Sequence, residues 1–183
     1  MARDTRNNGH LDLSLERTIE APRSLIWQVW TNPDHIKQWW APAPWTTSQC
    51  EIDLRPGGIF RTVLRSPEGQ EFPHLGCFIE LIENEKLVIT NALEPGYRPA
   101  RGPGGKDKAS TDCADIPFTS ILTLKERGGK THYSIVVLHR DEVDRRRHEE
   151  MGFHDGWNTC LDQLIEVVGR LQEPSHSTLR SLR

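Results

Sequence analysis

Apolar and polar residues alternate along several stretches of the chain, which is the pattern of strands buried on one face. Residues 11–19 alternate leucine or isoleucine with polar side chains and predict a first strand. Residues 72–82 carry apolar side chains at neighbouring positions, so this long strand is expected to be central or curved. Turns rich in glycine, proline or polar residues at 55–58, 66–69 and 127–130 separate the other expected strands, which are 49–54, 59–64, 86–91, 118–125 and 131–139.

Two helices are expected between the first strand and the second. Pro22 suits a first helical position because its missing N–H would be unpaired there anyway. Asn32 and Pro33 repeat this signal as a cap followed by a first-turn proline. The apolar residues that follow have helical spacing, namely Leu25, Ile26, Val29 and Trp30 for the first helix, and Ile36, Trp39 and Trp40 for a shorter second one.

A long helix is expected at the end of the chain. Asp141 is placed to cap it, and apolar residues three and four apart form a stripe from Trp157 to Leu171. Gly152 and Gly156 weaken its beginning by about 1 kcal/mol each relative to alanine, so a kink or break is expected there.

The order of elements is therefore strand, two helices, about six antiparallel strands and one long helix. This order predicts an α+β fold in which the antiparallel sheet buries one face against the last helix. At 183 residues the chain suffices for one domain of ordinary size, which we assign to residues 11–172. Residues 1–10 and 173–183 are polar and are expected to be flexible tails.

Residues 94–117 interrupt the strand pattern with four prolines and four glycines. A loop this long in a compact domain is usually functional or disordered. Two interpretations stay open. In one, the loop is a lid in which Tyr97, Arg98 and Arg101 close over a cavity or bind an anionic group; in the other, it is a flexible insertion with solvated charges.

Charge and hydropathy exclude several classes of partner. The net charge of −3 with 27% charged residues gives no global field for nucleic acid or a membrane surface. The only tight basic run, 145–147, fits a solvated helix face. No apolar stretch approaches the ~20 residues that cross a bilayer, and the N-terminus lacks a signal-peptide core. We therefore expect a cytoplasmic protein.

The residues typical of metal, thiol and nucleotide chemistry do not have the required spacing. The four cysteines contain no C-x-x-C pair and are expected to be free thiols. His148 and His154 are six apart, about 120° around a helix, so they do not share a metal-binding face. We also find no phosphate-binding glycine loop, dinucleotide fingerprint or nucleophile elbow. We therefore expect no metal and no cofactor.

Four segments together resemble a known superfamily. They are IEAPRSLIWQVWTNPDHIKQWW, DLRPGGIF, GCFIELIENEKLVIT and HEEMGFHDGWNTCLDQLIEVV, in this order along residues 11–171. The chain thereby resembles the SRPBCC or START-like superfamily, which includes the birch-pollen allergens. Within it, the branch of homologues of the activator of heat-shock protein ATPase is the most similar. The resemblance implies a helix-grip fold, in which a curved antiparallel sheet surrounds a long C-terminal helix and leaves a cavity between them.

The resemblance also implies which residues lie near that cavity. Two interpretations of Trp39, Trp40 and Trp45 stay open, since these residues suit a core beneath the first helices as well as a cavity mouth. Glu150 and His154 are four apart on the expected helix, about 40° apart around its axis. They either face the cavity, where they bind a polar end of the ligand or act as acid and base, or form an exposed helix pair or a helix-start salt bridge. His74 is a further weak catalytic candidate. The expected lining consists of Trp39, Trp40, Trp45, Phe60, Phe78, Tyr97, His154, Trp157 and Leu161.

Three functions are compatible with this resemblance, because one fold supports many activities. The preferred one is binding of a hydrophobic or aromatic small molecule in the cavity, without catalysis. The second is an enzyme of the polyketide cyclase or dehydratase type that uses the same cavity. The third, which we favour least, is a co-chaperone-like domain that acts on a heat-shock chaperone. Nucleic acid and membrane partners are not expected, and a homodimer is compatible with the sequence.

Overall fold

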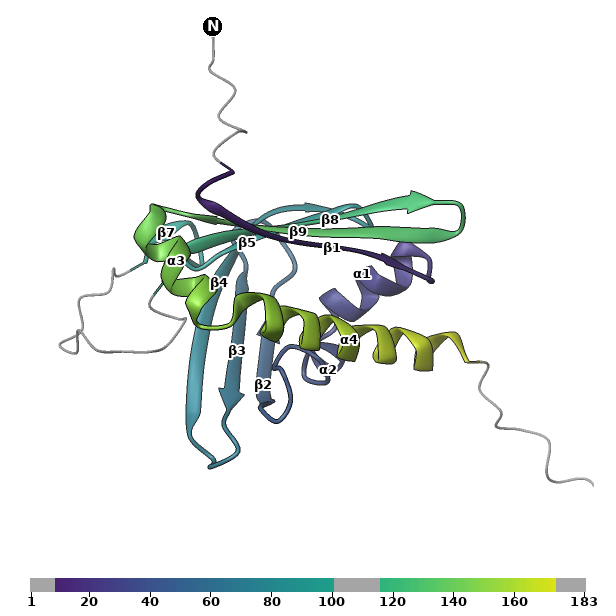
Figure 1. The fold of residues 1–183 in the computed structure, drawn as a ribbon, viewed down its shortest axis with the longest axis horizontal. Helices are drawn as coiled ribbons and strands as arrows, with labels where there is room; N and C mark the ends of the chain where they lie inside the picture. The colour runs from purple at the N-terminus through teal and green to yellow at the C-terminus, as the bar shows by residue number, and fades with distance from the viewer. Residues whose placement is uncertain (1–8, 101–115, 174–183) are drawn as a thin grey trace, which may run out of the picture.

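The computed structural model describes residues 9–100 and 116–173 and contains a large, curved antiparallel sheet (Figure 1). Its seven strands follow the order β1-β9-β8-β5-β4-β3-β2. They are β1 (Asp12–Ile19), β2 (Thr46–Ile52), β3 (Ile59–Arg65), β4 (Glu71–Ile82), β5 (Lys86–Thr90), β8 (Phe118–Arg127) and β9 (Lys130–His139). The two short strands β6 (Leu93–Glu94) and β7 (Arg98–Pro99) pair separately. The predicted α+β class and the six strands after the first helices are confirmed.

A bulge in β4 explains its apolar residues on both faces. The pairing of β4 with β5 shifts between Phe78 and Glu80, so one residue is inserted and the alternation of sides changes there. Phe78 and Leu81, which are three positions apart, both pack in the same hydrophobic core for this reason. Bulges also increase the local bend and twist of a strand, which suits the curvature of this sheet.

The first two helices lie inside the curve of the sheet. Helix α1 (Arg23–Thr31) buries the four residues Ile26, Trp27, Val29 and Trp30. Pro22 is its N-cap rather than its first helical residue, because its ψ of 143° is extended. Helix α2 (Pro33–Ile36) begins as predicted, with the Asn32 side chain accepting a hydrogen bond of 2.8 Å from the Asp34 N–H.

The C-terminal helical segment is divided in two. Asp141 caps α3 (Glu142–Glu150), where its side chain accepts a hydrogen bond of 3.0 Å from the Asp144 N–H. Gly152 then adopts a left-handed φ of 90°, which ends the helical path, and α4 (Phe153–Gln172) starts in a new direction. The break expected near Gly152 is therefore present, whereas Gly156 lies within α4.

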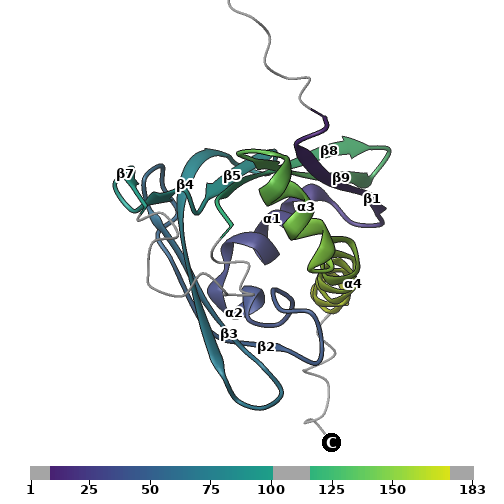
Figure 2. The same cartoon turned by 60° about the vertical axis from the view of Figure 1, so that its left-hand side comes forward.

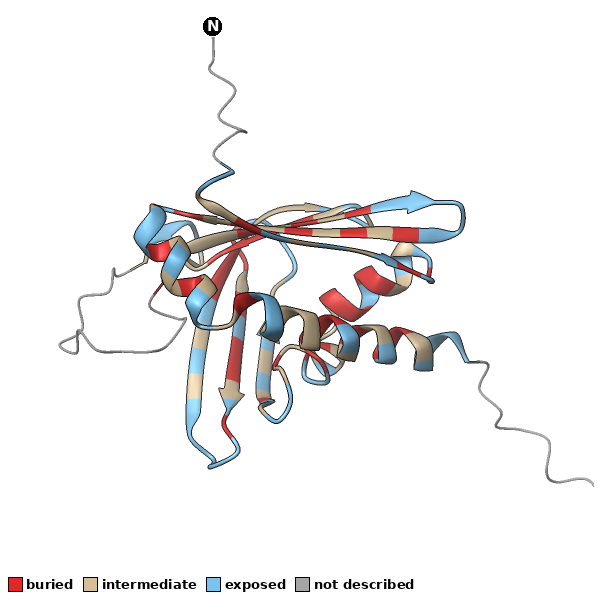
Figure 3. Ribbon diagram, in the orientation of Figure 1, coloured by how far each residue is buried: buried red, intermediate tan, exposed pale blue. Residues whose placement is uncertain are grey.

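Helix α4 runs across the concave side of the sheet and next to the first helices (Figure 2). Its inward face is buried while its outer face is exposed (Figure 3), as its apolar stripe predicts. Hydrogen bonds from its Gln163 side chain reach the carbonyls of Trp39 and Ala41 at 3.1 and 2.8 Å. An ion pair between Arg17 and Asp162 joins α4 to β1 on the other side. These contacts hold α4 between the sheet and the segment that follows α2.

The basic run belongs to α3 and is largely paired within that helix. Arg145 lies 2.7 Å from the Glu149 carboxylate, and Arg146 lies 3.2 Å from that of Glu142. Both pairs are spaced four residues apart, as in a solvated helix face.

Several expectations lie outside the described residues. They are the flexibility of residues 1–8 and 174–183, the state of Cys113, and the choice between lid and insertion for residues 101–115. Within the described ranges, no helix has the length and apolar character that a bilayer crossing requires.

Candidate ligand cavity

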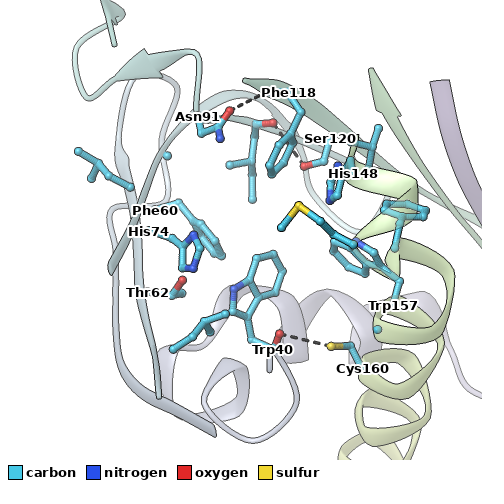
Figure 4. A pocket seen from close by; sticks show the side chains of 18 of the residues that line it. Trp40, Phe60, Thr62, His74, Asn91, Phe118, Ser120, His148, Trp157 and Cys160 are labelled. Carbon is cyan, nitrogen blue, oxygen red and sulfur yellow. Dashed lines mark hydrogen bonds between the residues drawn. The ribbon is translucent and has the colours of Figure 1, made fainter. Parts of the chain in front are cut away.

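A cavity of about 460 Å³ lies between the sheet and the α3–α4 segment (Figure 4). Strands β3, β4, β5 and β8 supply one side of it, and the residues around the break at Gly152 supply the other. Trp40, which follows α2, closes the end nearest the first helices. Cavities of roughly 300–1,000 Å³ are typical of small-molecule sites.

The apolar wall is organised around Trp40. Its ring centroid lies 5.1 Å from that of Phe60 on β3 and 5.6 Å from that of Trp157 on α4. A third contact, at 5.6 Å, reaches Trp30 in the core. All three pairs are edge-to-face, the arrangement that aromatic quadrupoles favour. The core therefore continues directly into the cavity wall.

The polar side chains of the sheet wall are partly committed to the backbone. Asn91 accepts a hydrogen bond of 2.8 Å from the Phe118 N–H and donates one of 2.9 Å to the Ile116 carbonyl. Ser120 donates a hydrogen bond of 3.3 Å to the Ile89 carbonyl. These two residues hold the strand ends together and are less free to bind a ligand.

Two histidines form a pair at the opposite wall. His148 of α3 lines the cavity, and its Nδ1 lies 2.9 Å from Nε2 of His139 on β9. The His148 ring packs against Phe118 and Phe153, with ring centroids 5.5 and 5.1 Å away. Burial lowers the pKa of His148 to about 4, because the loss of hydration and a second charge beside His139 in its protonated form both disfavour the imidazolium. His148 is therefore uncharged at neutral pH.

The cysteine nearest the cavity is a poor nucleophile. Cys160 lines the cavity and donates its S–H to the Trp40 carbonyl at 3.3 Å. Burial raises the pKa of its thiol to about 12, so the thiolate is scarce at neutral pH. Burial likewise raises the pKa of Cys50 to about 11. Among the described residues, no group of three potential metal ligands occurs.

Four of the residues named from the sequence line this cavity. They are Trp40, Phe60, Trp157 and the weak catalytic candidate His74. Three others, Trp39, Phe78 and Leu161, are fully buried in the core beneath it. Trp39 is fixed there because its indole N–H donates a hydrogen bond of 3.2 Å to the Val29 carbonyl.

The remaining named residues lie away from the cavity. Trp45 packs on Phe72 with their ring centroids 5.2 Å apart, and Tyr97 is half exposed above Gly57.

Glu150 and His154 do not share a helix face, because the break at Gly152 separates them. His154 is exposed and lies 3.9 Å from the Glu149 carboxylate instead. The expectation of a Glu150–His154 pair assumed one continuous helix and is corrected here.

His148 was missed by the sequence reasoning as a cavity residue, although the sequence contains a usable signal. It is a histidine in a helix that starts directly after β9, nine positions from His139. The chain reverses between them, so the end of the strand and the second turn of α3 face each other.

Comparison with known proteins agrees with the fold. The family described as "Activator of Hsp90 ATPase homolog 1-like protein" matches residues 20–169. A crystal structure of a protein from Nitrosomonas europaea is 38% identical, covers 90% of this chain and 97% of its own, and superposes with a TM-score of 0.80. No curated protein matches the chain.

Two more distant structures share the fold alone. A protein from Rhodobacter sphaeroides is 17% identical, with a TM-score of 0.72 and coverage of 90% of this chain and 96% of its own. A protein from Mycobacterium smegmatis is 18% identical, with a TM-score of 0.69 and coverage of 89% and 94%.

Proposed function

The chain belongs to the activator of Hsp90 ATPase homolog 1-like family, and from that premise we propose that it binds a small apolar or aromatic molecule between the sheet and α4. One observation carries the proposal. A space of about 460 Å³, walled largely by aromatic and aliphatic side chains, adjoins a core in which the same aromatic rings are closely packed.

The size of the aromatic wall is sufficient for useful affinity. Each ~100 Å² of apolar ligand surface removed from water contributes about 2.5 kcal/mol. A bicyclic aromatic compound presents two to three times that area, and micromolar affinity requires about 8 kcal/mol. Edge contacts with Trp40 and Trp157 add to the favourable binding free energy, and the loss of freedom of the bound ligand subtracts from it. The apolar contribution of about 5–7.5 kcal/mol alone is below ~8 kcal/mol, so affinities between the micromolar and the millimolar range are expected.

Two polar groups of the cavity, His148 and Cys160, suit binding better than acid–base catalysis. A base with a pKa of about 4 accepts protons weakly at neutral pH, which describes His148. The Cys160 thiol is protonated under the same conditions. The candidates Glu150 and His154 do not line the cavity.

Gly156 offers a direct test because it combines a place in the cavity wall with free space. A Cβ at this position would meet only Pro42, at 4.0 Å, so a larger side chain can extend into the cavity. We expect Gly156→Leu to fold, with a melting temperature equal to that of the natural protein or slightly above it, since leucine has a higher helix propensity than glycine. We also expect it to bind N-phenyl-1-naphthylamine at least tenfold more weakly.

Gly169→Leu is the matched control. Gly169 lies on the same helix, has no atom within 4 Å of its ideal Cβ, and does not line the cavity. The Gly169→Leu variant gains the same helix propensity but should leave the affinity for the probe unchanged. Probe fluorescence, with energy transfer from the tryptophans, measures the affinity of each variant. Equal binding by the natural protein and Gly156→Leu would contradict the proposal, as would the absence of binding by the natural protein.

A further inference from the structure

The hydrogen bonds of the two histidines determine what the cavity wall offers to a ligand. His139 Nδ1 lies 3.0 Å from the Leu11 carbonyl, and its Nε2 lies 2.9 Å from His148 Nδ1. The three groups come from the residue before β1, the end of β9 and the second half of α3. They form a chain of hydrogen bonds that starts at a backbone oxygen and ends at the cavity.

The direction of each hydrogen bond follows from the first one. A carbonyl oxygen only accepts, so His139 Nδ1 carries the hydrogen. With both rings uncharged, the second nitrogen of His139 is an acceptor, and His139 Nε2 receives its hydrogen from His148 Nδ1. His148 Nε2 is left with a lone pair. The wall therefore presents a hydrogen-bond acceptor at this point.

The surroundings of His148 keep the ring in this form and fix its direction. Phe118 and Phe153 hold the ring on two sides, and it is 8% exposed. Its one hydrogen bond to a described residue is the bond to His139, made by Nδ1. Figure 4 shows the His148 ring at the same wall as Trp157, across the cavity from Phe60.

The charge of the cavity lining disfavours an anionic ligand. Within the described part of the chain, the lining contains no lysine or arginine, and its one carboxylate belongs to Glu94. A ligand carboxylate would therefore lose its hydration without gaining a cationic partner. A neutral hydroxyl has no such cost.

We propose that the cavity selects aromatic or alicyclic molecules with a neutral hydroxyl group, which donates a hydrogen bond to His148 Nε2 while the rings pack between Trp40, Phe60 and Trp157. This inference rests on the proposed function and specifies the ligand class for the same cavity. His139 is a positioning residue, because it acts by setting the tautomer of His148. The expected ligands are phenols and related alcohols.

Three matched compounds test the selectivity, namely naphthalene, 2-naphthol and 2-naphthoate. Each compound is titrated into the full-length protein with bound N-phenyl-1-naphthylamine at pH 7.5. The displacement of this probe measures the affinity of the compound. We expect 2-naphthol to bind about three- to tenfold more tightly than naphthalene, the usual gain from one neutral hydrogen bond. We expect 2-naphthoate to bind more weakly than 2-naphthol. Tighter binding of 2-naphthoate would overturn the inference, because it would mean that His148 presents an N–H.

The variant His148→Phe retains a ring between Phe118 and Phe153 but has no nitrogen. In it, the preference for 2-naphthol over naphthalene should disappear. A preference that persists in this variant would overturn the inference. If no compound displaces the probe, or if the probe does not bind, the proposed function itself fails; if naphthalene binds and 2-naphthol has no advantage, only the ligand class fails.

Nitrogen-15 NMR of the imidazoles gives a second measurement that needs no variant. We expect His148 to be the Nδ1–H tautomer and its Nε2 signal to shift on addition of 2-naphthol. The opposite tautomer, or an Nε2 signal that 2-naphthol leaves unchanged, would overturn the inference even if His148→Phe does not fold.

Discussion

Substitution of Gly58 by alanine should destabilise the protein more than an ordinary turn substitution. Gly58 ends the turn between β2 and β3, and a Cβ at this position would lie 2.0 Å from the Asp53 carbonyl oxygen and 2.9 Å from that of Arg55. The turn cannot easily move away. The Phe78 N–H donates to the Gly58 carbonyl at 3.0 Å, and the Gly57 N–H donates to the Phe78 carbonyl at 2.8 Å.

The magnitude follows from what must change. Relieving the contact requires a strained backbone, at about 1–3 kcal/mol, together with the loss of one of these hydrogen bonds, at about 1 kcal/mol. We expect Gly58→Ala to lose about 2–4 kcal/mol of unfolding free energy. For a domain of this size each kcal/mol corresponds to about 2–4 °C, so the melting temperature should fall by about 4–16 °C.

Gly69→Ala separates the steric effect from the backbone effect. Gly69 has a left-handed φ of 90°, but no atom lies within 4 Å of its ideal Cβ. The unfolding free energy of this variant should fall by only about 1–2 kcal/mol, which is the cost of a left-handed backbone at a residue other than glycine. Urea unfolding followed by circular dichroism measures both variants. A Gly58→Ala protein as stable as Gly69→Ala would refute the reasoning, because it would show that the turn shifts at no cost.

Three further predictions concern the last helix and the cavity. Leu164→Ala, which truncates a fully buried side chain of α4, should cost about 2–5 kcal/mol, whereas Leu171→Ala at a 37% exposed position should cost much less; urea unfolding compares them. The pKa of His148 is lower in the folded state, about 4, than the ~6.5 of an unfolded histidine, so the unfolded chain binds the proton first as the pH falls. Stability should therefore decrease by up to about 3 kcal/mol between pH 6.5 and pH 4, and His148→Phe should lack this decrease in pH-dependent unfolding. Cys160, whose pKa burial raises to about 12, should resist iodoacetamide at pH 7.5 until urea unfolds the protein, as mass spectrometry of the labelled peptides will show.

Most of the fold was predictable from local patterns. The alternation in residues 11–19 and the Asn32-Pro33 signal depend on neighbouring residues, and both describe the structure. A central or curved β4 was expected from its apolar residues on both faces, and β4 lies inside the sheet between β5 and β3. The bulge after Phe78, its cause, depends on the pairing with β5, which is not a local property.

The site was less predictable, because it depends on how distant segments meet. Trp39 and Trp40 are adjacent in sequence, but only Trp40 lines the cavity, while the backbone carbonyl of Val29 fixes Trp39 in the core. The relation between Glu150 and His154 was inferred from a regular helix, which a left-handed Gly152 interrupts. No spacing rule predicts that Leu11, His139 and His148 form one chain of hydrogen bonds.

The seven-stranded sheet is open, with β1 at one edge and β2 at the other. Edge strands can pair with other molecules, which leads to aggregation unless the edge is interrupted or charged. Strand β1 carries Asp12, Glu16 and Arg17, and β2 carries Glu51 and an irregular register after Thr47. A second molecule would have to align these charges and match this irregularity before its strands could pair. Concentrated solutions of the folded protein should therefore resist growth of the sheet from molecule to molecule.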